Sequence, residues 1–138
     1  MSTEHFRKQH AEIADIVGQI NASLIPNKLE ANPAPMRALF LKLSGKLSVH
    51  LAMEDDSLYP KLMKHGDEKV RTVAKAFSTE MADVKPKFEG FVHKWNEAAI
   101  RGGAPAFCDE TRKLFGVLAD RMRREDRELY DMVDRIGA

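Results

Sequence analysis

The sequence lacks the features that secreted disulfide proteins and membrane proteins need. Its 138 residues include a single cysteine, Cys108, so no intramolecular disulfide can form, which agrees with a reducing compartment. No stretch approaches the roughly 18 uninterrupted apolar residues of a membrane span. The first ten residues, MSTEHFRKQH, carry charges where a signal peptide has an apolar run. We therefore expect a cytoplasmic protein without a membrane partner.

An excess of charge of one sign is also lacking. The chain has 22 Lys and Arg against 21 Asp and Glu, a net charge of +1, which gives no reason to expect a nucleic-acid partner. Glycine and proline are few and collect in a few places, and no sustained period-2 alternation predicts a strand. Length and composition are those of a soluble globular protein, and we predict a single domain over residues 1–138.

Helix-forming residues fill the stretches between the prolines and glycines. The predicted helices span approximately residues 3–25, 32–64, 67–100 and 104–136, with a loop from Pro26 to about Asn32. Pro60 is expected to kink the second helix and Pro86 to bend the third. Since the connections are short, consecutive helices are antiparallel neighbours. The predicted fold class is all-α, an antiparallel up-down four-helix bundle.

Each predicted helix has an apolar stripe at spacings of three and four, and polar residues interrupt every stripe. The interruptions are His10, His50, Glu54, Glu80, Arg121 and Glu125. Reflecting each helix through its connecting loop places them at about one height. Burying an uncompensated polar group costs about 2–7 kcal/mol, against a total stability of about 5–15 kcal/mol. This layer therefore needs a metal cation, Arg121, protonated histidines or water to compensate it.

Charge counting leaves the number of metal ions open. The three glutamates of the layer contribute three negative charges and Arg121 offsets one of them. A single dication would neutralise the remainder. Two ferrous ions would leave an excess of positive charge, which hydroxide ligands could reduce.

Three segments resemble the hemerythrin-like (HHE cation-binding) domain family. They are QHAEI around His10, HLAMEDDSLYP from His50 to Pro60, and RMRREDRELY from Arg121 to Tyr130. The resemblance covers essentially the whole chain and implies a four-helix bundle around a non-haem di-iron centre. It also implies that His10, His50, Glu54 and Glu125 are metal ligands.

Two positions depart from the family pattern. Glu80 stands where the third helix would offer a histidine, and Arg121 where the fourth helix would offer one. Arginine stays protonated and cannot ligate a metal, so we expect it to hydrogen-bond a carboxylate. Glu80 is expected to ligate or bridge, with a buried salt bridge to Arg121 as the alternative. Tyr59 and Tyr130 follow the second and fourth motifs and could bring a hydroxyl group to the site or pack at the end of the bundle.

The departures shape the expected chemistry. A site with fewer imidazoles and more carboxylates favours harder cations and resembles the carboxylate-bridged di-iron sites of ferritin-like bundles. Iron is the expected metal, as one or two ions, with manganese and zinc as alternatives. Reversible oxygen carriage is not expected.

Three functions compete. The leading hypothesis is a metal-binding protein whose buried iron site binds or senses oxygen, nitric oxide or peroxide. The alternative is a metal-free bundle, closed by a salt-bridge network around Arg121, that acts as a signalling or protein-binding module. The third is an oxidase of the carboxylate di-iron type, although no catalytic nucleophile constellation or substrate signature is present.

Overall fold

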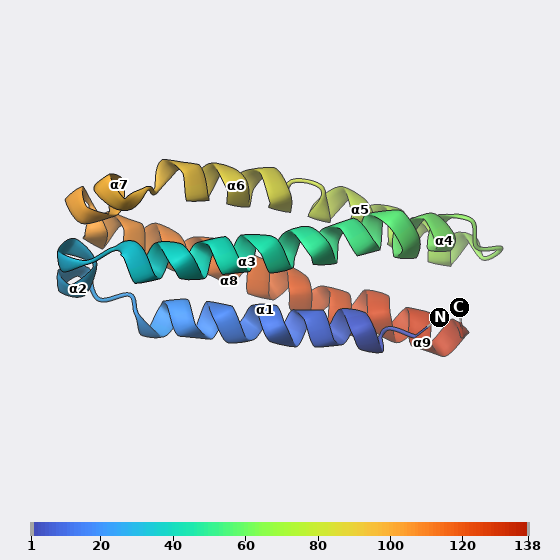
Figure 1. The fold of residues 1–138 in the computed structure, drawn as a ribbon. Coiled ribbons are helices and arrows are strands. Elements are labelled where there is room, and N and C mark those ends of the chain that lie inside the picture. The colour runs from blue at the N-terminus through green and yellow to red at the C-terminus, as the bar shows by residue number, and fades with distance from the viewer. Residues whose placement is uncertain (1, 138) are drawn as a thin grey trace.

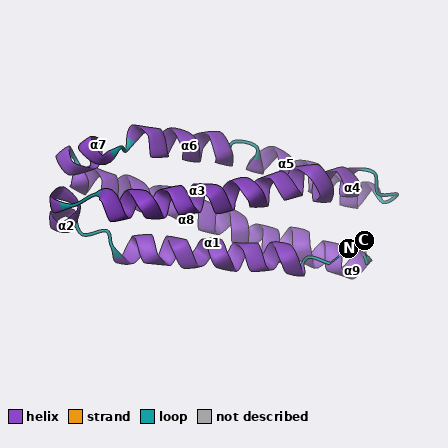
Figure 2. Ribbon diagram, in the orientation of Figure 1, coloured by secondary structure: helices purple, strands orange, loops and turns teal. Residues whose placement is uncertain are grey.

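The computed structural model describes residues 2–137, which fold into helices and contain no strand (Figures 1 and 2). The α-helices are α1 (Glu4–Ala22), α2 (Pro26–Ala31), α3 (Ala34–Met53), α4 (Tyr59–Met63), α5 (Glu68–Met81), α6 (Val84–Lys94), α7 (Glu97–Gly102), α8 (Ala104–Arg124) and α9 (Asp131–Ile136). Two π-helical segments, η1 (Glu54–Leu58) and η2 (Glu125–Tyr130), continue α3 into α4 and α8 into α9.

The helices form four antiparallel rods that lie side by side (Figure 1). The first rod is α1, the second is α3 with η1 and α4, the third is α5 with α6, and the fourth is α8 with η2 and α9. Both termini lie at one end of the bundle, and α2 and α7 lie at the other (Figure 1). The predicted antiparallel four-helix bundle is confirmed.

Several predicted boundaries were wrong, and prolines explain two of them. The first helix ends at Ala22, and Pro26 begins α2 where a loop was predicted, because a proline fits the first turn of a helix. The predicted third helix is three helices. Its first break lies at residues 82–83, four residues before Pro86, because proline has no N–H to donate to the carbonyl group of Ala82.

The second break of the predicted third helix lies next to Trp95, between α6 and α7. Asn96 caps α7 by accepting a hydrogen bond from the backbone N–H of Ala99 at 2.9 Å. At the start of α5 the Asp67 carboxylate caps the helix by accepting from the backbone N–H of Lys69 at 2.9 Å. Pro60 lies in the first turn of α4, directly after η1.

The apolar interior consists of two clusters. In the larger one the ring of Phe40 lies 5.6–6.0 Å from the rings of four other phenylalanines. The smaller cluster, near the termini, includes Phe6, Leu58 and Leu129. Along each of three rods a buried polar residue separates the two clusters, namely His10 in the first, Glu54 in the second and Glu125 in the fourth.

None of the helices in the described part of the chain is both long and apolar enough to cross a membrane.

Candidate metal centre

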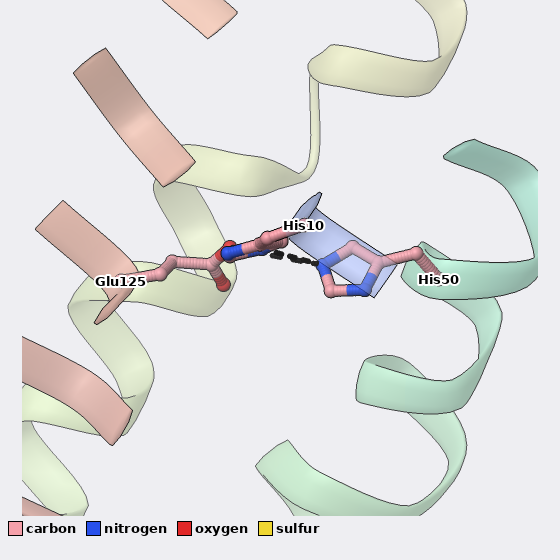
Figure 3. Close-up of side chains that lie close together, drawn as sticks. All are labelled: His10, His50 and Glu125. Atoms are coloured by element: carbon pink, nitrogen blue, oxygen red, sulfur yellow. Dashed lines mark hydrogen bonds and ion pairs between the residues drawn. The ribbon is translucent and has the colours of Figure 1, made fainter. Parts of the chain in front are cut away.

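Side chains from three rods converge at the polar layer. His10 of α1, His50 of α3 and Glu125 of η2 each place a ligand atom within 4.8 Å of the other two (Figure 3). The two Nε2 atoms of the histidines are 3.0 Å apart, and Oε1 of Glu125 lies 3.2 Å from Nε2 of His10. Glu54 joins the group, with Oε1 3.3 Å from Nε2 of His50. All four side chains are 0–5% exposed, so these contacts form away from water.

Hydrogen bonds on the outer side of each imidazole fix its tautomer. Nδ1 of His10 lies 2.8 Å from a carboxylate oxygen of Asp126, and Nδ1 of His50 lies 2.7 Å from the amide oxygen of Gln9. Both oxygens only accept hydrogen bonds. The proton of each neutral ring is therefore on Nδ1, and the lone pair of Nε2 faces the centre. Outward N–H donation of this kind orients histidines that bind metals.

The two carboxylates are held in a matching way. The Tyr59 hydroxyl donates to Oε2 of Glu125 at 2.8 Å, and the Tyr130 hydroxyl donates to Oε2 of Glu54 at 2.7 Å. Burial, reinforced by the negative charges of both glutamates, raises the pKa of both tyrosines, so their hydroxyls stay protonated donors. The inner oxygens, Oε1 of each glutamate, are buried and have no hydrogen-bond donor among the described residues.

Two nitrogen and two oxygen lone pairs thus face one another inside the protein without a proton between them. Such an arrangement is costly unless a positive charge lies among the four atoms. A mixed set of imidazole and carboxylate ligands suits iron, manganese or zinc. The residues present therefore fit a bound metal ion, with Asp126, Gln9, Tyr59 and Tyr130 holding the ligands.

Without a metal, protons compensate the same atoms. Burial lowers the pKa of His50, but Glu125 and Glu54 outweigh it and raise this pKa to about 9. Burial, together with the negative charge of Glu125, raises the pKa of Glu54 to about 7. A cation that binds here must displace those protons, so metal binding and protonation compete.

In each π-helical segment the tyrosine follows the glutamate of the same segment by one π turn. The backbone N–H of Tyr59 donates to the carbonyl of Glu54, five residues earlier, and Tyr130 follows Glu125 at the same spacing. In an α-helix the residue four positions on, a leucine in both segments, would take that place. Pro60 is not the cause, because Asp131 holds the corresponding position after η2. π turns occur frequently at functional sites.

The structure does not bring Glu80 or Arg121 to the centre. This corrects the prediction of Glu80 as a ligand, whereas Arg121 does hydrogen-bond a carboxylate, as expected, but that of Asp83. A guanidinium nitrogen of Arg121 donates to Asp83 at 2.6 Å and to the backbone carbonyl of Glu80 at 3.2 Å. The Glu80 carboxylate pairs with Arg124. The break in the third rod explains the change, because the carbonyls at the end of α5 lack intrahelical donors. Lys87 and Arg121 lower the pKa of Asp83 to about 2, so the pair stays charged.

Two residues that orient the ligands were not predicted. Asp126 could have been found from the sequence, because E-D-x-x-L-Y occurs twice, from Glu54 to Tyr59 and from Glu125 to Tyr130. This repeat singles out Asp55 and Asp126 alike, and the structure brings only Asp126 to a histidine. Gln9 has no comparable signal.

A sequence model described as "Hemerythrin HHE cation binding domain" matches residues 1–133. The chain belongs to this family. Neither the curated proteins nor the solved structures include a match to the chain. The hemerythrin HHE family is described as cation-binding, which agrees with the buried group of His10, His50 and Glu125.

Proposed function

We propose that this hemerythrin-family protein binds non-haem iron at the buried centre and that the site binds or senses oxygen, nitric oxide or peroxide. The observation that carries the proposal is the convergence of four donor atoms whose protons are held elsewhere. The Nε2 atoms of His10 and His50 lie 3.0 Å apart, the Tyr130 hydroxyl lies 3.3 Å from Nε2 of His10, and each glutamate presents an oxygen without a donor. A single cation at this position would satisfy all four atoms at once, whereas protons must be shared among several groups to do the same.

The surroundings favour a small ligand. Bound iron would supply a coordination position at which a diatomic molecule or peroxide can bind. The ring of Phe6 lies 6.1 Å from that of His50 and 5.8 Å from that of Tyr130, and it covers the centre on the side of the termini. The larger apolar cluster covers the other side. Such walls exclude bulk water and leave little space for a large substrate.

Metal analysis tests the proposal directly. Protein purified without chelator, or reconstituted anaerobically with Fe(II), is expected to hold stoichiometric iron and to form a nitrosyl complex visible by EPR. A His50→Ala variant should lose most of the iron. His93→Ala is the matched control, since His93 is exposed and lies on a different rod. Failure of the wild-type protein to retain any transition metal under either condition would reject the proposal.

A second candidate, a metal-free bundle that acts as a signalling or protein-binding module, has its own support. Ion pairs of Arg121 with Asp83 and of Arg124 with Glu80 hold the third and fourth rods together without a metal. In addition, a protonated His50 offsets one of the two buried carboxylate charges, and a protonated Glu54 removes the other. This candidate predicts the same thermal unfolding temperature with and without added iron, whereas an iron protein is stabilised by its metal.

A further inference from the structure

We infer that the centre holds one metal ion, rather than the pair that a resemblance to di-iron hemerythrins implies. This inference rests on the proposed function, because it concerns the same site. The ion would contact Nε2 of both histidines and the inner oxygen of both glutamates. Three independent features of the described chain leave a second ion without ligands.

The first feature is the pair of tyrosine hydroxyls. A carboxylate that bridges two ions offers one oxygen to each. Here the outer oxygens of Glu125 and Glu54 already accept hydrogen bonds from Tyr59 and Tyr130, at 2.8 Å and 2.7 Å. A second ion on that side would have to displace two buried phenols, which would lose their hydrogen-bond partners.

The second feature is the third rod, which offers no ligand at this height. The buried residues of α5 on either side of the layer are Phe77, in the smaller apolar cluster, and Met81, in the larger one. The nearby carboxylate of Glu80 is partly exposed and pairs with Arg124. No histidine or cysteine of the described third rod faces the centre.

The third feature is the side chain of Arg121. It lies four residues before Glu125, as His50 lies four residues before Glu54. The guanidinium group cannot ligate a metal, and it is held at Asp83. The fourth rod therefore contributes one ligand, while the second rod contributes two.

Charge supports the same number. Glu54 and Glu125 carry two negative charges, and the imidazoles and phenols are neutral when a metal is bound, so one dication neutralises the ligand set. A second dication would leave uncompensated positive charge among side chains that are 0–5% exposed, which is costly. Asp126 lies at the edge of the site with its side chain 37% exposed, where water screens it.

An anaerobic titration of the whole protein with Fe(II), followed by equilibrium dialysis, measures the stoichiometry. We expect saturation at one equivalent. After oxidation, a single high-spin ferric ion gives an EPR signal, whereas an antiferromagnetically coupled ferric pair is silent. Two equivalents with a silent ferric form would overturn the single-ion inference and leave the proposed function intact. No uptake would overturn both, so the two failures are distinguishable.

Histidine variants give an independent test. In a one-ion site, His10→Gln and His50→Gln each remove a ligand of the same ion, so each should lose tight binding of all the metal. A variant that still binds one equivalent with the affinity of the wild type would reveal a separate second site and overturn the inference. Circular dichroism and thermal unfolding verify that each variant is folded.

The tyrosines are positioning residues in this arrangement. Tyr59→Phe and Tyr130→Phe should keep the stoichiometry at one and weaken the iron affinity roughly 10-fold, as is typical when a group that orients a ligand is removed. A purely structural role would lower the unfolding temperature without changing affinity. Unchanged iron affinity in both variants would contradict the assignment of the outer oxygens to the phenols.

Discussion

The two halves of the bundle carry the same six-residue pattern, E-D-x-x-L-Y, but they differ at the residue four positions before its glutamate. In the first half this residue is His50, whose ring faces the centre. In the second half it is Arg121, which leaves the centre and binds Asp83. Each tyrosine donates a hydrogen bond to the glutamate of the other half, Tyr59 to Glu125 at 2.8 Å and Tyr130 to Glu54 at 2.7 Å. The carboxylates and phenols of the two halves are therefore arranged symmetrically, whereas both histidine ligands come from the first half, on α1 and α3.

The aspartates of the repeat differ in the same way. Asp126 holds Nδ1 of His10 at 2.8 Å. The side chain of Asp55, at the matching position, makes no hydrogen bond or ion pair within residues 2–137, and the third rod presents Phe77 and Met81 instead of an imidazole. Both aspartates could therefore orient a histidine on a neighbouring rod. Asp126 has such a partner in His10, whereas Asp55 has none in the described part of the chain.

The largest expected effect comes from exchanging the two differing residues for alanine. His50→Ala removes a ligand and should weaken iron binding by more than about 100-fold, beyond what loss of an orienting group causes. Arg121→Ala should leave iron affinity and stoichiometry unchanged, because Arg121 does not contact the centre. Competition against a chelator of known affinity measures both. Equal losses in the two variants would show that the halves contribute alike.

The second effect concerns pH. The pKa of Glu54 is about 7, raised from 4.5, and that of His50 is about 9, raised from 6.5, so the folded metal-free protein binds protons more tightly than the unfolded chain. Its stability should therefore fall as pH rises from about 5 to about 9, first through Glu54 and then through His50. Glu125, whose pKa is lowered, acts only at more acidic pH.

The iron-bound protein provides the contrast for this pH experiment. Its ligands have already lost their protons, so the stabilisation by iron should grow over the same pH range. Thermal unfolding with and without bound metal, at constant ionic strength, measures both curves. Parallel curves would mean that protons and metal do not compete for the same atoms.

The third effect compares the two aspartates. Asp126→Ala should weaken iron affinity by about 10-fold to 100-fold, because His10 loses the group that fixes its tautomer. Asp55→Ala is the matched control and should leave affinity unchanged, since its side chain orients no ligand. Isothermal titration with Fe(II) under anaerobic conditions distinguishes them. An equal loss of affinity in Asp55→Ala would contradict the statement that the Asp55 side chain orients no ligand.

The smallest effect is on stability. The ion pair of Arg121 with Asp83 is partly exposed, with side chains 19% and 40% accessible, so Arg121→Ala should cost about 1 kcal/mol rather than the larger cost of breaking a fully buried pair. Denaturant unfolding of the metal-free protein measures this change.

Arg121→His should not raise the metal stoichiometry above one, because the third rod still lacks a ligand. Uptake of a second ion by Arg121→His would show that residue 121 alone limits the number.

The sequence predicted the fold because helix formers, apolar stripes and short connections all indicate the same bundle. Reflection through the loops also brought His10, His50, Glu54 and Glu125 to one height, where the structure places them together. That method is accurate to about one helical turn, and it assumes continuous helices. It places Glu80 at the height of the layer, but Phe77 and Met81 take the inward positions of α5 there, and the Glu80 carboxylate pairs with Arg124.

Side-chain direction was the other limit. The spacing of Arg121 from Glu125 suggests that both face the centre, but an arginine is long enough to reach Asp83 across the groove between two rods. Gln9 was missed because an amide next to a histidine carries no pattern that distinguishes it from surface residues. Its role depends on the relative rotation of α1 and α3, which only coordinates reveal.

The π turns also change how such sites should be recognised in sequences. Each one contains one residue more than an α-helical turn, which rotates everything after it by about 100° around the helix axis. Deleting one residue between Glu54 and Tyr59 would preserve a helix but turn the tyrosine, and all of α4, away from their present neighbours. A search for this arrangement should therefore require a glutamate and a tyrosine five positions apart, twice in one chain, rather than the four-residue spacing that helices usually favour.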